Sequence, residues 1–339
     1  EKHGIEPRRL KVTAAGRGSG KWFTTTYAAG EAEPGSPSKT PGVLVVGAGV
    51  NRMLYGSEYD WNLMRAARGL REAGYRVVLL TTVSPAVLEL EEAFDRIYMD
   101  AVTLEDILNI AGLESVEGVI LQYGGETALE LADVLVRCGI RILGNEPDDL
   151  RSLAKMRLRK EGVYQARQID NETQWEQMFN ELARSDVDSV LTEPLVPEAI
   201  GVMIGCVGDG KNCVVAGVAE QIEEAGIHPG DSAFSSPPYS LNHELIGRME
   251  RFAAEMVRRL AIRGWIEWRF AVKHDRLYLI SADPSANAMV LFFSRATGVD
   301  WAAEAAKILV GGSLDGRLSE KPQISGTAVK EAVFSFKHF

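Results

Sequence analysis

An alternation of apolar runs with amphipathic segments between residues 43 and 145 constrains the fold more than any other feature of the sequence. The runs GVLVVGAG, RVVLLTT and GVILQYGG are almost purely apolar, which is typical of strands buried on both faces of a parallel sheet. Segments with the spacing of a helix separate them, among them SEYDWNLMRAARGLREAGY and LEDILNIAGL. This order predicts a doubly wound α/β domain over residues 43–145.

The pattern changes after residue 145. The segments AIGVMIGCVGDGKNCVVAGVAEQI and IRGWIEWRFAVKHDRLYLISAD each join two strand-like runs through a turn, at GDGKN and at HDR, which predicts β-hairpins. Helical segments, HELIGRMERFAAEMVRRLAI and WAAEAAKILVGG, are expected to cover them. We therefore expect a separate α+β domain over residues 146–315, a Gly-, Ser- and Pro-rich linker over residues 1–42, and a tail over residues 316–339.

Charge and cysteine content narrow the classes of function. The chain carries 47 acidic and 37 basic residues, a net charge of −10, which argues against binding of nucleic acid or of anionic membranes. No apolar run reaches the roughly 18 residues of a membrane span. Three cysteines without a CxxC motif predict free thiols in a reducing compartment, the cytoplasm or the interior of an organelle. No pattern of a targeting segment opens the sequence given.

Two glycine turns follow predicted strands, in VGAGVNR and in QYGGE. Because the carboxyl ends of parallel strands meet at one edge of a sheet, the two turns predict a crevice there that could hold an anion. The dinucleotide fingerprint is incomplete, since arginine stands where its third glycine belongs, so a tight turn without a ligand is an equal interpretation. The residues of this candidate anion site are Gly47, Gly49, Asn51, Arg52, Gly124 and Gly125.

Several stretches between about residue 43 and residue 315 resemble, in order, the large subunit of carbamoyl phosphate synthetase: VGAGVNRMLYGSEYDW, GVILQYGGETALELA, EQIEEAGIHPGDSAFSSPPYSL, FAVKHDRLYLI and ATGVDWAAEAAKILVGGSL. That subunit has two homologous synthetase halves, and the third stretch resembles the second half, which phosphorylates carbamate. The resemblance implies a pre-ATP-grasp domain with a doubly wound parallel sheet, followed by an ATP-grasp-like α+β domain whose lobes clamp MgATP.

The metal-binding strand of the family ends in Glu-x-Asn-Pro-Arg, and the matching residues here, 281–285, read SADPS. Ser281 therefore replaces a glutamate that binds two magnesium ions, and Ser285 replaces an arginine. In WIEWRFAV, Arg269 stands where the family has a metal-binding glutamine. A guanidinium only donates hydrogen bonds and cannot coordinate a cation. The resemblance thus implies a degenerate metal site.

Three interpretations of Arg269 remain open from the sequence. Arg269 is an ordinary strand residue paired with Asp283 or Glu267, or it forms an ion pair with Asp283 that fills the former metal site. In the third interpretation Glu267 and Asp283 are altered ligands of a weak metal site, because a two-residue offset places Glu267 on the same strand face as Arg269.

The resemblance also implies residues that bind the nucleotide. In AGIHPGDS these are His228, Gly230 and Asp231, and Glu193 or Glu198 would replace the acid that binds the ribose. The alternative is that these residues only form a connecting loop and a core strand. The lid segment of the family, several tens of residues that cover the ATP phosphates, has no counterpart near residues 157–163, so the lid lobe is either truncated or missing from the sequence given.

These features predict a synthetase half that has lost catalysis and acts as a non-catalytic partner or scaffold. Its partners would be another synthetase half, further copies of the chain in a homo-oligomer, or a glutaminase subunit. ATP and Mg²⁺ would be weakly bound or lost. One alternative is an active ATP-grasp ligase or kinase that forms carbamoyl phosphate from carbamate and MgATP, and a second is a sensor of anions or nucleotides.

Overall fold

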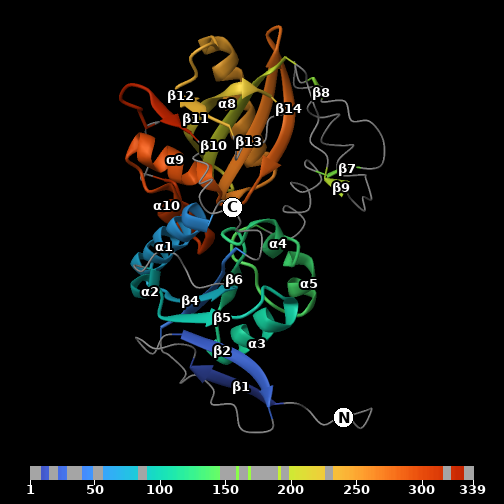
Figure 1. The fold of residues 1–339 in the computed structure, drawn as a ribbon, viewed down its shortest axis with the longest axis vertical. Helices are drawn as coiled ribbons and strands as arrows, with labels where there is room; N and C mark the ends of the chain where they lie inside the picture. Colours follow the sequence, from blue (N-terminus) through green and yellow to red (C-terminus); the bar gives the residue numbers. More distant parts are fainter. Residues whose placement is uncertain are drawn as a thin grey trace, which may run out of the picture. The chain divides into compact units, whose positions relative to one another are not determined.

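The computed structural model describes residues 9–14, 22–28, 40–48, 56–82, 90–145, 158–159, 167–168, 190–191, 198–225, 232–315 and 322–331. The chain divides into two compact units (Figure 1). Unit 1 comprises Glu1–Pro147 and Ser285–Asn287, and unit 2 comprises Asp148–Pro284 and Ala288–Phe339. None of the described helices combines the length and the apolar character that crossing a membrane requires.

The described residues of unit 1 form a six-stranded sheet in the order β1-β2-β5-β4-β3-β6. Three of its parallel strands, β3, β4 and β6, are those that the apolar runs predict, whereas the parallel strand β5 was not predicted; the side chains of β3 are fully buried. Their bounds are β3 (Gly42–Val46), β4 (Arg76–Thr81), β5 (Arg96–Met99) and β6 (Gly118–Ile120).

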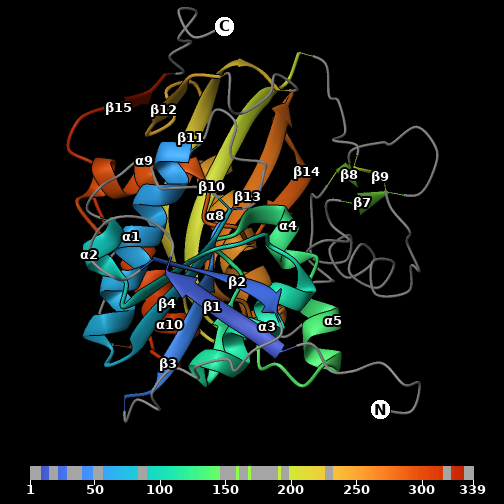
Figure 2. The ribbon, with the colours of Figure 1, turned by 60° about the horizontal axis from the view of Figure 1, so that its bottom comes forward.

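A hairpin of β1 (Arg9–Ala14) and β2 (Trp22–Ala28) extends this sheet, with β2 parallel to β5 (Figure 2). The sequence predicts a linker over these residues, because Gly-, Ser- and Pro-rich segments flank two short runs. The run WFTTTYA nevertheless has the aromatic and β-branched residues that favour a strand. Asp100 binds β2 directly: its carboxylate accepts hydrogen bonds from the Thr24 hydroxyl at 2.6 Å and from the Thr25 amide at 2.9 Å.

The helices of unit 1 lie on both sides of the sheet, α1 and α2 on one side and α3 and α5 on the other (Figure 1). The longest, α1, buries a stripe with helical spacing that includes Leu63, Ala67 and Leu70. Thr103 caps α3 by accepting a hydrogen bond from the Asp106 amide. The bounds are α1 (Gly56–Glu72), α2 (Leu90–Ala93), α3 (Leu104–Glu114), α4 (Gly125–Leu129) and α5 (Ala132–Arg137).

A buried carboxylate, Glu114, connects α3 to the sheet of unit 1. It accepts hydrogen bonds from Arg76 of β4 at 2.6 Å and from Arg96 of β5 at 2.8 Å. The Tyr98 hydroxyl donates to the same carboxylate at 2.5 Å. Burial, together with this hydrogen bond and the charge of Glu114, raises the pKa of Tyr98 well above its ordinary value, so the hydroxyl stays a donor.

The described residues of unit 2 form a seven-stranded antiparallel sheet in the order β15-β12-β11-β10-β13-β14-β8. The predicted hairpins are present, β10 with β11 and β13 with β14. A further short pair joins β7 (Leu158–Arg159) to β9 (Val190–Leu191). The sheet's strands are β8 (Arg167–Gln168), β10 (Ile200–Asp209), β11 (Cys213–Glu224), β12 (Phe234–Ser236), β13 (Arg263–Lys273), β14 (Arg276–Asp283) and β15 (Ala328–Lys330).

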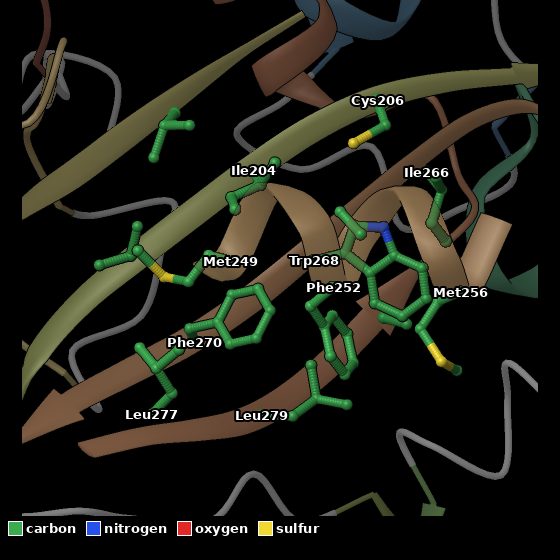
Figure 3. Packing of buried hydrophobic residues seen from close by; sticks show 14 of the residues in the cluster. Ile204, Cys206, Met249, Phe252, Met256, Ile266, Trp268, Phe270, Leu277 and Leu279 are labelled. Atoms are coloured by element: carbon green, nitrogen blue, oxygen red, sulfur yellow. The ribbon is translucent and has the colours of Figure 1, made fainter. Parts of the chain in front are cut away.

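Helix α8 (His243–Arg259) covers one face of this sheet and forms the core of unit 2 (Figure 3). Phe252 of α8 makes edge-to-face contacts with two residues of β13, Trp268 at 5.5 Å and Phe270 at 5.3 Å between ring centroids. Because alternate residues of a strand point to opposite faces, the odd-numbered residues of β13 lie on the other face. The candidate site lies on this other face, away from α8.

Helices α9 (Ala288–Thr297) and α10 (Trp301–Leu309) pack against the sheet of unit 2 as well. Phe293 of α9 contacts Trp265 of β13, with 6.4 Å between the ring centroids. Two glycines make room for these rings, since a Cβ on Gly205 would lie 2.3 Å from Trp265 and one on Gly217 would lie 2.3 Å from Phe293. The contact between Trp265 and Phe293 therefore lies on the face of the sheet that carries the odd-numbered residues of β13.

Asp209 fixes the turn between β10 and β11 to a segment that follows α10. Its carboxylate accepts hydrogen bonds from the backbone amides of Lys211, Asn212 and Leu314 at 2.7 to 3.0 Å. Burial alone would raise the pKa of Asp209, but these amide hydrogen bonds outweigh it and lower the pKa to about 2. The carboxylate is therefore ionised at neutral pH.

Candidate functional site

The candidate site lies on the face of β13 and β14 that points away from α8. The register pairs Glu267 with Asp283 and Arg269 with Ser281, so the four side chains share one face of the strand pair. Three of them are almost inaccessible, with 0% of Glu267, 2% of Ser281 and 5% of Asp283 exposed. The structure thus brings together four of the residues that the sequence predicted for a degenerate metal site, whereas Ser285 belongs to a segment that groups with unit 1.

Arg269 pairs with Glu267. Its Nε donates a hydrogen bond to Oε1 of Glu267 at 2.8 Å, within an ion pair whose carboxylate side chain is completely buried. This is one of the partners that the sequence left open. The pair places a fixed positive charge on the face that carries both candidate carboxylates. Separating such a pair costs more than forming it gains, because either partner alone would be a buried charge without compensation.

Ser281 lies opposite Arg269 on β14, next to a register irregularity of the strand pair. Its Oγ is buried and has no hydrogen-bond partner within the described part of the chain. A hydroxyl buried in this way costs about 1–3 kcal/mol. The buried Ser281 hydroxyl therefore lowers the stability of the fold. Ser281 is also the residue that stands where the family pattern has a glutamate.

The residues present do not fit the two-magnesium site that the resemblance implies. Mg²⁺ is held by hard oxygen ligands in octahedral geometry, usually one or two carboxylates together with phosphate oxygens. Here Glu267 is already paired with a guanidinium and Ser281 is neutral, and Asp283, which replaces the family's asparagine, is the other carboxylate on this face. The described residues include no group of three or more His, Cys, Asp and Glu side chains that could hold a metal ion.

Glu198, one of the predicted nucleotide ligands, lies at the surface. The Glu198 side chain is 81% exposed and forms a surface ion pair with Lys273 at 3.4 Å. Its carboxylate is thus in a solvated position just before β10. The remaining predicted nucleotide ligands lie outside the described residues: Glu193, His228, Gly230 and Asp231.

The two glycine turns of unit 1 touch each other at Gly124. A Cβ on Gly124 would lie 2.4 Å from Cβ of Ala128, 2.9 Å from the Val46 carbonyl oxygen and 3.1 Å from that of Gly47. Close packing of two backbones therefore accounts for this glycine, and a positive φ of 67° accounts for Gly125. The anion site stays a prediction, because Gly49, Asn51 and Arg52 lie outside the described residues.

Sequence reasoning missed one buried polar residue, Asn62. It is fully buried on α1, and its side-chain amide donates to the backbone of the segment Ser285–Asn287. The available signal was a polar residue within the buried stripe of an amphipathic helix, in DWNLMRAA. Its acceptors lie more than 200 residues away in the sequence, so no local pattern could identify them.

Two family models match the chain. The model of the carbamoyl phosphate synthase preATP-grasp domain matches residues 39–152, and that of the carbamoyl-phosphate synthase L chain, ATP binding domain, matches residues 167–317. Among curated proteins, the carbamoyl phosphate synthase large chain of Vibrio vulnificus is 33% identical over 346 positions, covering 90% of this chain and 32% of the relative. That of Ralstonia nicotianae is 33% identical over 363 positions, covering 92% and 34%.

The chain spans about a third of the length of these curated relatives. The alignment with the Vibrio vulnificus protein is also longer than the chain. Since 90% of 339 residues is about 305, about 40 of its 346 positions have no counterpart here.

Solved structures of carboxylases share the fold at low sequence identity. Kluyveromyces lactis urea carboxylase matches with a TM-score of 0.59 and 17% identity, over 86% of this chain and 23% of that one. The biotin carboxylase domain of a single-chain bacterial carboxylase matches with a TM-score of 0.59 and 15% identity, over 86% and 74%. At this identity the likeness shows the fold alone, a pre-ATP-grasp domain followed by an ATP-grasp-like domain.

Proposed function

Because the chain belongs to the carbamoyl phosphate synthase large-chain family, we propose that it is a degenerate synthetase half that no longer transfers a phosphoryl group and acts as a non-catalytic partner or scaffold. The observation that carries the proposal is the ion pair of Arg269 with Glu267, opposite the buried Ser281. The stretch EQIEEAGIHPGDS favours the second, carbamate-phosphorylating half as its origin.

Electrostatics explains why this arrangement opposes metal binding. At a separation of 4 Å and an effective dielectric constant of 20, a guanidinium and a divalent cation repel each other by about 8 kcal/mol. Glu267 offsets part of this repulsion, but its charge is then no longer available to the metal. Replacement of the family's glutamate by Ser281 removes a further carboxylate, so two independent changes weaken the same site.

A reduced lid supports the same proposal. The two family models leave residues 153–166 between them unmatched, which includes the region near residues 157–163 where the sequence lacks the lid. About 40 positions of the alignment with the Vibrio vulnificus protein have no counterpart in this chain. We propose a pre-ATP-grasp domain over residues 43–145 and an ATP-grasp-like domain with a truncated lid over residues 146–315.

The proposed partners follow from the loss of activity. A synthetase half that cannot phosphorylate needs an active half, a second copy of itself or a glutaminase subunit to contribute to carbamoyl phosphate formation. ATP is then bound weakly, without the metal that phosphoryl transfer requires.

One observation favours the alternative of an active ligase that forms carbamoyl phosphate from carbamate and MgATP. Glu267 and Asp283 lie directly opposite each other, so two carboxylates remain on the face where the family holds metal. For this alternative Arg269 would have to leave Glu267. The active form would therefore be destabilised by the loss of that buried ion pair.

An assay of ADP release tests the proposal. The chain is incubated with MgATP and ammonium carbamate, beside a variant with the family's residues restored, Arg269→Gln with Ser281→Glu and Ser285→Arg. We expect no carbamate-dependent ADP from the wild-type chain, and the large chain of Vibrio vulnificus serves as the positive control. Carbamate-dependent ADP release by the wild-type chain, abolished by Asp283→Ala, would overturn the proposal in favour of the active ligase.

A further inference from the structure

The segment Ser285–Asn287 directly follows the end of β14, yet it belongs to unit 1. Two residues of unit 1 bind its backbone. Nδ2 of Asn62 donates to the carbonyl oxygens of Ala286 at 3.0 Å and Asn287 at 2.8 Å. The Ala286 amide donates to the carbonyl oxygen of Gln122 at 2.9 Å. Three hydrogen bonds thus fix the backbone of two consecutive residues, Ala286 and Asn287.

The chemistry of Asn62 suits this task. Two converging carbonyl oxygens need two N–H donors from one group, and a primary amide supplies both. An aspartate has the same shape but offers only acceptors when ionised. The side chain is fully buried, so water cannot replace the two hydrogen bonds if the donor is lost.

The side-chain oxygen of Asn62 indicates that the hydrogen bonds of the Nδ2 group, and not those of Oδ1, account for an asparagine at this position. Its Oδ1 is buried and has no hydrogen-bond partner within the described residues. An unsatisfied buried acceptor is unfavourable, and an apolar residue of similar size would avoid it. The contact with the backbone of Ala286 and Asn287 explains why an asparagine occupies the buried stripe of α1.

We propose that Asn62 is a positioning residue: its amide clamps the backbone of residues 286 and 287 and so fixes the conformation of the segment that follows Asp283. The inference rests on contacts within unit 1 and holds whether or not the site on β13 and β14 is active. It assigns a role to a residue outside the family pattern of that site. The Asn62 side-chain amide thus holds the segment Ser285–Asn287, in which Ser285 replaces the family's arginine.

Hydrogen exchange of the full chain tests the clamp with Asn62→Asp. At pH 8 we expect the protection of amides in a peptide over residues 284–288 to fall about tenfold or more relative to wild type, because two hydrogen bonds are replaced by repulsion. Carbonyl oxygens around a buried carboxyl group raise its pKa. At pH 5 the protonated aspartic acid regains one donor, so protection should recover to within about threefold of wild type at the same pH.

Two further variants make the test decisive. Asn242→Asp is the matched control, since Asn242 caps α8 as an acceptor for the Leu245 amide and aspartate caps equally well. It should leave the peptide over residues 284–288 unchanged. Asn62→Ala removes the donor without adding charge and should lose protection at both pH values, which keeps the test open if Asn62→Asp folds only in acid. Unchanged protection in both Asn62 variants would overturn the proposal, as would a loss in Asn62→Asp without recovery at pH 5.

Discussion

Arg269 and Glu267 lie two residues apart on β13, and the guanidinium Nε donates to the carboxylate Oε1 at 2.8 Å. The carboxylate is completely buried, and its cross-strand neighbour is Asp283. A side chain of this protein thus supplies positive charge on the face where the family pattern has metal ligands. The consequences of this pair can be measured separately for stability and for ligand binding.

The first prediction concerns the stability of this pair. Glu267→Gln and Arg269→Gln should each lower the free energy of unfolding by about 2–4 kcal/mol, because each leaves a buried charge without its partner. The double variant should lose clearly less than the sum, since neither charge remains. Urea denaturation of the four proteins gives the coupling energy.

The surface pair of Glu198 with Lys273 is the matched control for this cycle. Glu198→Gln removes an exposed partner and should change stability by no more than about 0.5 kcal/mol. Strict additivity of the two substitutions on β13 would show that Arg269 and Glu267 do not depend on each other.

A second prediction separates packing from ligand binding at the glycine turns. Gly124→Ala should destabilise unit 1 by about 2 kcal/mol or more, because the new Cβ would lie 2.4 Å from Ala128 and 2.9 Å from the Val46 carbonyl oxygen. Gly112→Ala is the control: it lies in α3, where no atom of the described residues comes within 4 Å of the new Cβ. Alanine should stabilise that helix by up to about 1 kcal/mol. Thermal unfolding of both variants checks the difference in sign.

The third prediction is a pH dependence from Asp209. Its pKa is lowered to about 2 in the folded chain, so it contributes stability that is present above the ordinary pKa of an aspartate. That contribution should be lost as the pH falls from about 4 towards 2, and it amounts to about 2 kcal/mol from the size of the shift. Asp209→Asn should lose it at pH 7 and show a smaller change in stability between pH 4 and pH 2 than wild type. Equal acid sensitivity of the two proteins would contradict the role assigned to Asp209.

The parallel sheet of unit 1 was predictable because strands buried on both faces must be apolar throughout, as in GVLVV of β3. The hairpin β1–β2 was not, since its second strand adds to the edge of a sheet whose nearest member, β5, lies about 70 residues further along. Local composition around these strands is typical of a linker, and only the long-range pairing overrides it.

The sequence predicts which residues of the candidate site share a strand face, but it does not predict which of their side chains pair. The two-residue period of a strand places Glu267 and Arg269 together, and the hairpin register brings Ser281 and Asp283 opposite them. The partner of Arg269 depends on side-chain rotamers, which the sequence does not specify. Asn62 was missed for a different reason, because its acceptors come from a distant segment of the chain.

The central claim is that the site on β13 and β14 no longer binds nucleotide through magnesium. Thermal unfolding of the full chain, with saturating MgATP and with ATP plus EDTA, tests it most directly, because a ligand that binds only the folded state must stabilise it. The account predicts the same melting temperature in both, within about 1 °C, whereas a ligand at a hundred times its Kd would stabilise by about 2.7 kcal/mol, several degrees for a chain of this size. A saturable rise in melting temperature that requires magnesium and disappears in Asp283→Ala would contradict the account.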